Sequence, residues 1–501
     1  MDKTMQSMVP HRRMITFSIM LATVMQTLDS TIANVALPHM QGGLSASQEQ
    51  VTWVLTSYIV AAAIATPLTG WMSNQFGKKN VLLASIFGFT IASCLCGIST
   101  TLPEIVLSRM LQGISGAALV PLSQTILLDI NPRERQGSAM AIWGIGVMVG
   151  PILGPTLGGW LTDSYNWRWV FFINVPVGMV ATYGVATYIK KQPPGKSMHF
   201  DMFGFATLSI AIGALQLLFD RGEQNDWFSS VETCVEAAVM IMSFLYFLVH
   251  TLLTPPEKSF FNFRLLKNYQ YSTGLLLIFI IGLLLYATRA LIPPMLQNLM
   301  GYPVTTAGIV TAPSGVGTML AMLLVGRLIA RVDIRFLLLA GFSIAAFSLW
   351  EMSQYTLVLS EADIIWPGFI QGIGLGMIFV PLSTATFSTL SPEMRAEGTA
   401  IYSLVRNIGS SIGISLVQTL LTRNTQIVHA GLVEHVSHYN PIFTDEKVSS
   451  VYDINSVSGL VALNNEINHQ AAMTGYIDDY WMMFILTITI IPLVFLMRSS
   501  K

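Results

Sequence analysis

The chain of 501 residues contains fourteen apolar runs, each close to the length that an α-helix needs to cross a lipid bilayer. A helix rises about 1.5 Å per residue, so about 20 residues span the hydrocarbon core. Inside a bilayer every backbone polar group must pair within the protein, which favours helices for runs of this length. The expected spans are residues 14–37, 51–73, 80–99, 103–128, 137–161, 168–189, 202–219, 231–252, 270–293, 306–326, 336–354, 364–390, 398–421 and 479–497. The sequence therefore predicts an all-α membrane protein with fourteen transmembrane helices.

The composition supports this class and excludes others. Only 11% of the residues are charged and 52% are hydrophobic, whereas a soluble domain has about 25% charged residues. The net charge is −1, so the chain has no basic field for nucleic acid. The three cysteines, Cys94, Cys96 and Cys234, do not form the pattern of a disulfide framework. The lipid bilayer is thus the first partner that the sequence predicts.

The basic residues are distributed unevenly between the two sides of the predicted membrane. With the N-terminus inside, 19 of the 26 Lys and Arg residues fall on the inner side and four on the outer side. Cytoplasmic loops carry such an excess, so both termini are predicted to be cytoplasmic. Arg109, Arg289 and Arg406 remain within spans, and Arg289 is expected to extend to the outer surface. The segment 422–478 is expected to form a long outer loop, with a short helix near its residues 459–463.

The two ends of the chain repeat one another. The stretch "QGISGAALVPLSQ" from Gln112 returns as "QGIGLGMIFVPLST" from Gln371, and Arg135 in the first copy corresponds to Arg395 in the second. Spans 1–6 therefore repeat as spans 9–14, and spans 7 and 8 are an insertion. We expect an N-terminal six-helix bundle (1–190), two inserted helices with linkers (191–268) and a C-terminal six-helix bundle (269–501). Parallel halves of this kind are typical of alternating-access transporters, which bind substrate between the halves.

Several motifs together carry a family resemblance. They are "LDSTIANVALP" at 28–38, "GWMSNQFGKK" at 70–79, "RMLQGISGAALVPLSQ" at 109–124, "GIGVMVGPILGPTLGGWL" at 144–161, "WRWVFFINVPVG" at 167–178 and "DWFSS" at 226–230. With them the chain resembles the fourteen-span drug:proton antiporters of the major facilitator superfamily, and among these the EmrB-type multidrug exporters. The resemblance implies two bundles rocking about a central cavity and proton-driven efflux of amphipathic toxic compounds, hence antibiotic resistance. It implies the bacterial inner membrane, protons as coupling ion with no cofactor, and a periplasmic adaptor and outer-membrane channel as partners.

Asp29 is the most unusual residue of the first span. It lies about 22 Å into the predicted helix, where a charged carboxylate costs about 2.5–3.5 kcal/mol on insertion scales. Burial favours the protonated form of a carboxyl group, so Asp29 is expected to exchange protons. A carboxylate that binds either substrate or proton, but not both, would couple the two. The alternative is a structural carboxylate bound to a neighbouring helix.

Arg109 is the second residue expected in proton coupling. In family members that share its motif, this arginine is linked to proton movement, and Gln112 and Gly113 shape the helix. We expect Arg109 to act on Asp29 electrostatically or to order a buried network. The alternative is an arginine that donates to backbone carbonyls.

Glycine and proline positions form two conformational motifs. Gly146, Gly150, Gly154 and Gly158 recur every four residues, which places them on one helix face where another helix can approach closely. Pro151 and Pro155 lie between them and are expected to bend the helix. Gly70 and Gly77 are expected to allow a tight cytoplasmic turn. Asn74 stands where many superfamily members have Asp, which removes a carboxylate from this turn.

Aromatic and polar residues of the spans are candidates for the substrate cavity, because such side chains adapt to varied apolar ligands. The candidates are Gln26, Trp53, Tyr58, Gln124, Trp143 and Arg406. A single-component antiporter or an importer for a narrower substrate remains an alternative function. An intramembrane serine protease is the alternative from the enzyme class, since "GISG" at 113–116 offers a serine and His250 is embedded in a span. The spacing of His429, His435 and His438 does not predict a metal site.

Overall fold

The computed structural model describes residues 10–191, 200–255, 258–437, 440–444, 448 and 450–497. Every regular element among these residues is a helix. Thirteen continuous or nearly continuous helices are long and apolar enough to cross a membrane, and α2 (Gln48–Ala65) with α3 (Leu68–Phe76) makes a fourteenth crossing that bends by 55°. The prediction of an all-α protein with fourteen spans is therefore confirmed.

The helices fall into two bundles and an insertion. The N-terminal bundle also contains α1 (Arg12–Gly43), α4 (Lys78–Ile98), α5 (Leu102–Gly116), α6 (Leu119–Ile130), α7 (Arg133–Ser164), α8 (Trp169–Phe172) and α9 (Asn174–Tyr188). The insertion contains α10 (Met202–Arg221), η1 (Trp227–Ser229) and α11 (Val231–Leu253). The C-terminal bundle contains α12 (Tyr269–Pro294), η2 (Met295–Leu299), α13 (Val304–Leu328), α14 (Ile334–Met352), α15 (Glu361–Ser388), α16 (Arg395–Val433), η3 (Pro441–Thr444), α18 (Val457–Ile490) and η4 (Ile491–Leu496).

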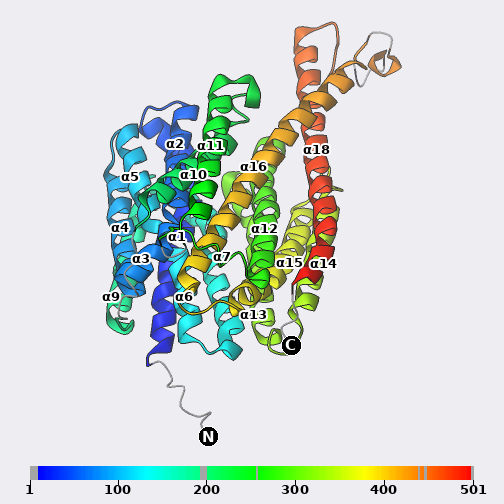
Figure 1. Ribbon diagram of the computed structural model, residues 1–501. Helices are drawn as coiled ribbons and strands as arrows, with labels where there is room; N and C mark the ends of the chain where they lie inside the picture. The colour runs from blue at the N-terminus through cyan, green and yellow to red at the C-terminus, as the bar shows by residue number, and fades with distance from the viewer. Residues whose placement is uncertain are drawn as a thin grey trace.

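The first turn of α1 and the last turn of η4 lie at the same end of the molecule (Figure 1). We call this the inner end, because the distribution of basic residues predicts that it is cytoplasmic, and the opposite end the outer end. The two bundles stand side by side, and α7 packs along α13 between them. Where they cross, Ser138 donates a hydrogen bond to the carbonyl of Gly326 at 2.8 Å.

The inserted helices lie against both bundles. Helix α10 packs on α2 of the N-terminal bundle and on α16 of the C-terminal bundle, where Ser411 donates to the Gln216 side chain at 2.8 Å. Asp201 joins the inner end of the insertion to the linker that follows it. Burial alone would raise the pKa of Asp201, but hydrogen bonds from the N–H groups of Gly204 and Phe260 and the contact with His250 hold it below its usual value. The insertion is therefore fixed at both of its ends.

The outer segment differs from the loop expected at 422–478. Helix α16 continues to Val433 and α18 begins at Val457, so both project beyond the rest of the molecule at the outer end (Figure 1). The polar composition that indicated a loop reflects exposure to water, not loss of helix. The two helices support each other there: a Cβ on Gly475 would lie 2.9 Å from Thr425 Oγ1, and His429 contacts Asn464 at 3.2 Å. The expected short helix at 459–463 is the first part of α18.

A carboxylate joins the two bundles at the inner end. Asp129, at the end of α6, forms ion pairs with Lys78 of α4 and, at 3.0 Å, with Arg395 at the start of α16. One turn deeper, the hydroxyl groups of Thr125 and Thr399 lie 2.8 Å apart. These contacts hold the inner ends of α6 and α16 together. The structure is therefore closed between α6 and α16 on the side predicted to be cytoplasmic.

The expected inner turn is formed by only one of its two glycines. Gly77 has a positive φ of 81° between α3 and α4, a conformation that favours glycine. Gly70 lies instead within α3, where a Cβ would come within 2.9 Å of the Glu397 Cα on α16. Its small size allows this close approach between bundles. Although Asn74 cannot supply a carboxylate to the turn, Asp129 supplies one to Lys78 from α6.

Replacing Asp129 with Asn should favour conformations in which the inner end is open. The change removes the ion pair with Arg395, the one of its two ion pairs that joins the bundles. Such a contact is worth about 1.5–3 kcal/mol, so the open population should rise about 10-fold or more. The measurement is the alkylation rate of a cysteine introduced at the buried Thr399, in a background without native cysteines. Asp163→Asn, which removes an exposed contact with His39, is the control. Equal rates in both variants would show that Asp129 does not hold the inner end closed.

Candidate functional site

Helix α1 carries Asp29 and is seated on the glycine face of α7. A Cβ on Gly150 would lie 2.4 Å from the Thr27 backbone, and one on Gly154 would lie 2.2 Å from Thr31 Oγ1. The Thr31 hydroxyl also donates to the carbonyl of Gly150 at 3.0 Å. Gly146 and Gly158 continue this face, against Met20 and Ile32, and Pro151 and Pro155 lie within the same helix. The glycine spacing therefore fixes the position of α1 on both sides of Asp29.

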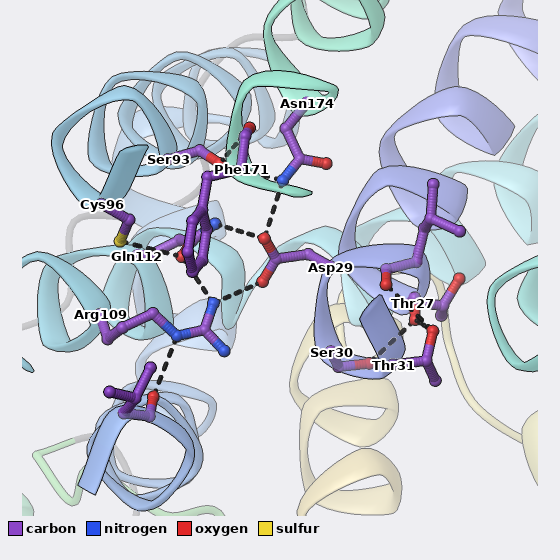
Figure 2. Close-up of polar contacts among 12 residues, drawn as sticks. Thr27, Asp29, Ser30, Thr31, Ser93, Cys96, Arg109, Gln112, Phe171 and Asn174 are labelled. Carbon is purple, nitrogen blue, oxygen red and sulfur yellow. Dashed lines mark hydrogen bonds and ion pairs between the residues drawn. The ribbon is translucent and has the colours of Figure 1, made fainter. Parts of the chain in front are cut away.

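Three side chains from two other helices surround the Asp29 carboxylate (Figure 2). Arg109 of α5 donates to one oxygen at 2.7 Å, and Gln112 of α5 and Asn174 of α9 donate to the other at 2.8 and 2.7 Å. The Asp29 and Arg109 side chains are each only 1% exposed. A buried charge pair of this kind is stable only when its remaining donors and acceptors are also paired. The Asp29 carboxylate meets this condition, because both of its oxygens accept hydrogen bonds.

Arg109 is held independently of Asp29. Its Nε donates to the carbonyl of Val54 on α2 at 3.0 Å, and its Nη1 also donates to the side-chain oxygen of Gln112 at 2.7 Å. The guanidinium lies over the Tyr58 ring, with its Cζ atom 4.4 Å from the ring centroid. Arg109 therefore acts on Asp29 directly and also donates to a backbone carbonyl, so the two interpretations of the sequence coexist.

Asn174 and Ser93 were not anticipated from the sequence. Asn174 also donates to the Ser93 hydroxyl at 2.9 Å, and Ser93 donates to the carbonyl of Phe171 at 2.9 Å. Cys96 lies 3.6 Å from the Gln112 side-chain oxygen. The available signal was a single amide in an apolar run, "FFINVPVG". A buried amide of this kind needs a partner, but the sequence does not say which helix provides it.

The other cavity candidates do not form one cluster. Trp143 is fully buried and stacks on Phe379 of α15, with ring centroids 6.0 Å apart, so it joins the two bundles. Gln124 is buried, and neither its amide nitrogen nor its amide oxygen has a hydrogen-bond partner among the described residues. The side-chain oxygen of Gln26 is also buried and also lacks such a partner there. Tyr58 belongs to the Arg109 network.

Trp53, Arg406 and Arg289 lie elsewhere. Trp53 borders a polar cavity of about 180 Å³ near the outer end, between α2 and α10, together with Asp220 and Arg221. Arg406 is buried in α16 and contacts the side chain of Asn407 at 3.4 Å. Arg289 does not extend to the outer surface as expected, because its Nη2 contacts the sulfur of Met148 on α7 at 3.6 Å. It therefore points from α12 toward the other bundle.

The histidines do not form a catalytic or metal site in the described residues. His250 contacts the carboxylate of Asp201 at 2.9 Å at the inner end, so it is not the base for Ser115 in "GISG". No group of three or more His, Cys, Asp or Glu side chains in the described part of the chain is arranged to hold a metal ion. His438 lies outside that part.

The framework around Asp29 does not rest on the ion pair alone. Val54, Gln112 and Tyr58 contact the guanidinium independently of Asp29. Gln112 and Asn174 donate to the carboxylate independently of Arg109. The attraction between Asp29 and Arg109 therefore joins α1 to α5 within a framework that other contacts also hold.

Replacing Arg109 with Met should destabilise the protein at neutral pH. It leaves the Asp29 charge buried without a counter-ion, which costs about 3–5 kcal/mol. The loss should shrink in the double variant Asp29→Asn/Arg109→Met, because the asparagine amide carries no charge. Thermal unfolding in detergent would measure both effects. Arg289→Met, which removes a cation without an ion pair in the described residues, is the control, and Asp29→Asn should not offset its effect; an equal offset in both variants would contradict the prediction.

Comparisons with known proteins agree with this architecture. The sequence pattern of the Major Facilitator Superfamily matches residues 19–414. The multidrug export protein EmrB of Escherichia coli K12 is 37% identical over 428 residues, which cover 85% of this chain and 83% of EmrB. The fatty acid resistance protein FarB of Neisseria gonorrhoeae is 33% identical over 97% of this chain and 96% of its own length.

Among solved structures, the human organic anion transporter MFSD10 superposes with a TM-score of 0.63 over 95% of this chain and all of its own, at 13% identity. At this identity the likeness concerns the fold alone. The pattern match and the close bacterial relatives concern the sequence itself, over most of its length. The chain therefore belongs to the Major Facilitator Superfamily and, within it, to the family of the EmrB multidrug export proteins.

Proposed function

We propose that this protein is an antiporter of the bacterial inner membrane that exports amphipathic compounds, drugs among them, in exchange for protons. The observation that carries the proposal is the Asp29–Arg109 pair at 2.7 Å, fully buried within a transmembrane bundle. Charged groups at such depth are costly and usually functional. The kinship with multidrug export proteins supports the direction of transport.

Protonation of Asp29 would reach the interface between the bundles through α1 and α7. When the attraction to Arg109 weakens, α1 can shift relative to α5. Helix α7 follows, because its glycine face is in backbone contact with α1. Helix α7 also packs along α13 of the other bundle, and its two prolines reduce its internal hydrogen bonding. A proton-dependent shift of α1 would thus change how the bundles rock against each other.

Amphipathic anions belong to the proposed substrates. Arg289 points from α12 toward Met148 of α7 and has no ion-pair partner among the described residues. An arginine between the bundles can bind a carboxylate head group with two donors. The relative FarB is named for fatty acid resistance. Trp143, stacked on Phe379, would provide an apolar surface for the remainder of such a molecule.

The projecting ends of α16 and α18 are the proposed contact for a periplasmic adaptor, through which an outer-membrane channel would complete the pump. Large apolar side chains are exposed there, beyond the transmembrane part of the bundle: Ile427, Leu432, Val433, Val457, Leu460 and Val461. Exposed apolar groups on a water-facing extension indicate an interaction surface. A single-component antiporter would have no use for them.

Replacing Asp29 with Asn should abolish proton-driven efflux while leaving the protein in the membrane. The amide cannot alternate between a charged and a neutral state, so the coupling step is lost. The measurement is efflux from energised cells of ethidium and of a fluorescent fatty-acid analogue, as cationic and anionic probes. The control variant is Asp163→Asn, which changes an exposed carboxylate at the outer end.

An uncoupler should stop efflux by the wild type and by the control variant to the same extent. Full export by Asp29→Asn, at equal protein level, would rule out Asp29 as the coupling carboxylate. Export by the wild type that persists with the uncoupler would rule out proton antiport altogether. Export of ethidium alone would remove anions from the proposed substrates.

Replacing Val457 and Val461 with Ser should weaken binding to a periplasmic adaptor without slowing transport in proteoliposomes. The two residues lie one turn apart on α18 and are 80% and 55% exposed. Copurification with the adaptor from native membranes measures the effect. Val231→Ser, at an equally exposed outer position on α11, is the matched control. Unchanged copurification, or no copurifying adaptor with the wild type, would favour a single-component antiporter.

A further inference from the structure

A second carboxylate is buried in the C-terminal bundle. Asp479 lies within α18, although the sequence placed it at the end of an outer loop. Its side chain is only 1% exposed, and neither carboxylate oxygen has a hydrogen-bond partner among the described residues. The neighbouring Asp478 is exposed. Asp479 therefore differs from Asp29, whose two oxygens together accept three hydrogen bonds.

No cation compensates the charge of Asp479. The acidic, basic and histidine side chains on the helices packed against α18 are Arg289 on α12, Arg335 and Glu351 on α14, and Arg395, Glu397, Arg406, Arg423 and His429 on α16, and the tyrosines there are Tyr269, Tyr271, Tyr286 and Tyr402. None of them forms an ion pair with Asp479 within the described residues. The charged group that acts on it is instead another acid, Asp478, and Asp479 in turn acts on the phenols of Tyr476 and Tyr480.

An isolated carboxylate in such surroundings is strongly disfavoured against the neutral acid. Transfer of a lone charge into an apolar interior costs so much that the group normally neutralises instead. The ring of Tyr480 packs against Tyr355, with centroids 5.8 Å apart, which adds to the exclusion of water. These surroundings favour the protonated form of the Asp479 carboxyl group.

Asp479 occupies a place in the C-terminal bundle that can be compared with the place of Asp29 in the N-terminal bundle. Asp479 lies 17 residues from Leu496, the last residue of η4 at the inner end. Asp29 likewise lies 17 residues from Arg12, the first residue of α1 at the inner end. Each distance corresponds to about 25 Å along an α-helix. The two carboxyl groups therefore lie at similar depth in the two bundles. Helix α18 is the sixth span of its bundle, as α8 and α9 are of theirs, and α9 carries Asn174, which binds Asp29.

An irregular segment lies beside Tyr480, the residue that follows Asp479. Helix α12 ends at Pro293 and Pro294 and continues as the π-helical turn η2. The hydroxyl group of Tyr480 lies 4.0 Å from the sulfur of Met295, the first residue of η2. Irregular turns of this type often mark places where a helix changes shape. A shift of η2 would alter the environment of Tyr480 and of the neighbouring carboxyl group.

We propose that Asp479 is a second proton-binding site, which accepts a proton from the outer aqueous side and releases it to water when the transporter changes conformation. The step breaks the O–H bond of the carboxylic acid, leaves a carboxylate and forms hydronium. This inference rests on the proposed proton antiport but concerns a different residue in the other bundle.

The protonation state of Asp479 can be measured without transport. Infrared spectra of the purified protein in lipid nanodiscs report the C=O band of protonated carboxylic acids. At neutral pH we expect a band that Asp479→Asn removes and that the matched control Asp478→Asn keeps. Addition of ethidium or of the fatty-acid analogue should diminish this band, and the same addition in weakly buffered solution should release fewer protons from Asp479→Asn than from the wild type.

The outcomes separate this inference from the proposed function. A band that is absent in the wild type, or that Asp479→Asn leaves in place, overturns the inference. A band that neither probe nor alkaline pH changes shows a permanently neutral acid and overturns it as well. If Asp29→Asn abolishes proton release while Asp479→Asn retains all of it, the inference about Asp479 is wrong and the proposed antiport function stands. If the wild type releases no protons with either probe, the antiport function itself fails.

Discussion

The buried pair of Asp29 and Arg109 is the interaction on which the N-terminal bundle depends. Removing two charges from water costs several kcal/mol for each ion, and their attraction offsets this only with good geometry and additional hydrogen bonds. Gln112, Asn174 and the Val54 carbonyl provide those bonds. Helices α1, α2, α5 and α9 must all be in place for the pair to be stable. One ion pair therefore specifies the arrangement of four helices.

The two bundles repeat one another in fold but not in polar chemistry. Gln112 of the first half binds Asp29, whereas its counterpart Gln371 borders a small, mostly apolar cavity with Thr288 and Thr487. The second half has no arginine at the position of Arg109, because Gly368 occupies the matching place in "PGFIQG". Without the arginine, a charged carboxylate at the position of Asp29 would be unpaired. The acid of the second half lies instead on α18, as Asp479.

The sequence was sufficient for the fold because apolar runs and the repeat are properties of single segments. The fourteen spans and the depth of Asp29 followed from hydropathy and helical rise alone. Arg109 was expected to act on Asp29, but Asn174, which contacts both Asp29 and Ser93, was not, because no local pattern encodes how α4 and α9 pack beside α1. The prediction of a loop over the outer ends of α16 and α18 was wrong for a different reason. Hydropathy reports where lipid ends, and these helices continue into water by packing on each other.

The glycine face of α7 limits how the site can transmit a change. Because Gly150 and Gly154 leave no side chain between α7 and α1, the two helices must move together or separate entirely. On its other side α7 meets α13, with Ile152 packed over Gly315. Any movement of α1 would therefore be passed to the bundle interface as displacement, not absorbed by side-chain rearrangement. The same close contacts explain why a bulky residue would be excluded from either glycine even though neither touches a charged group.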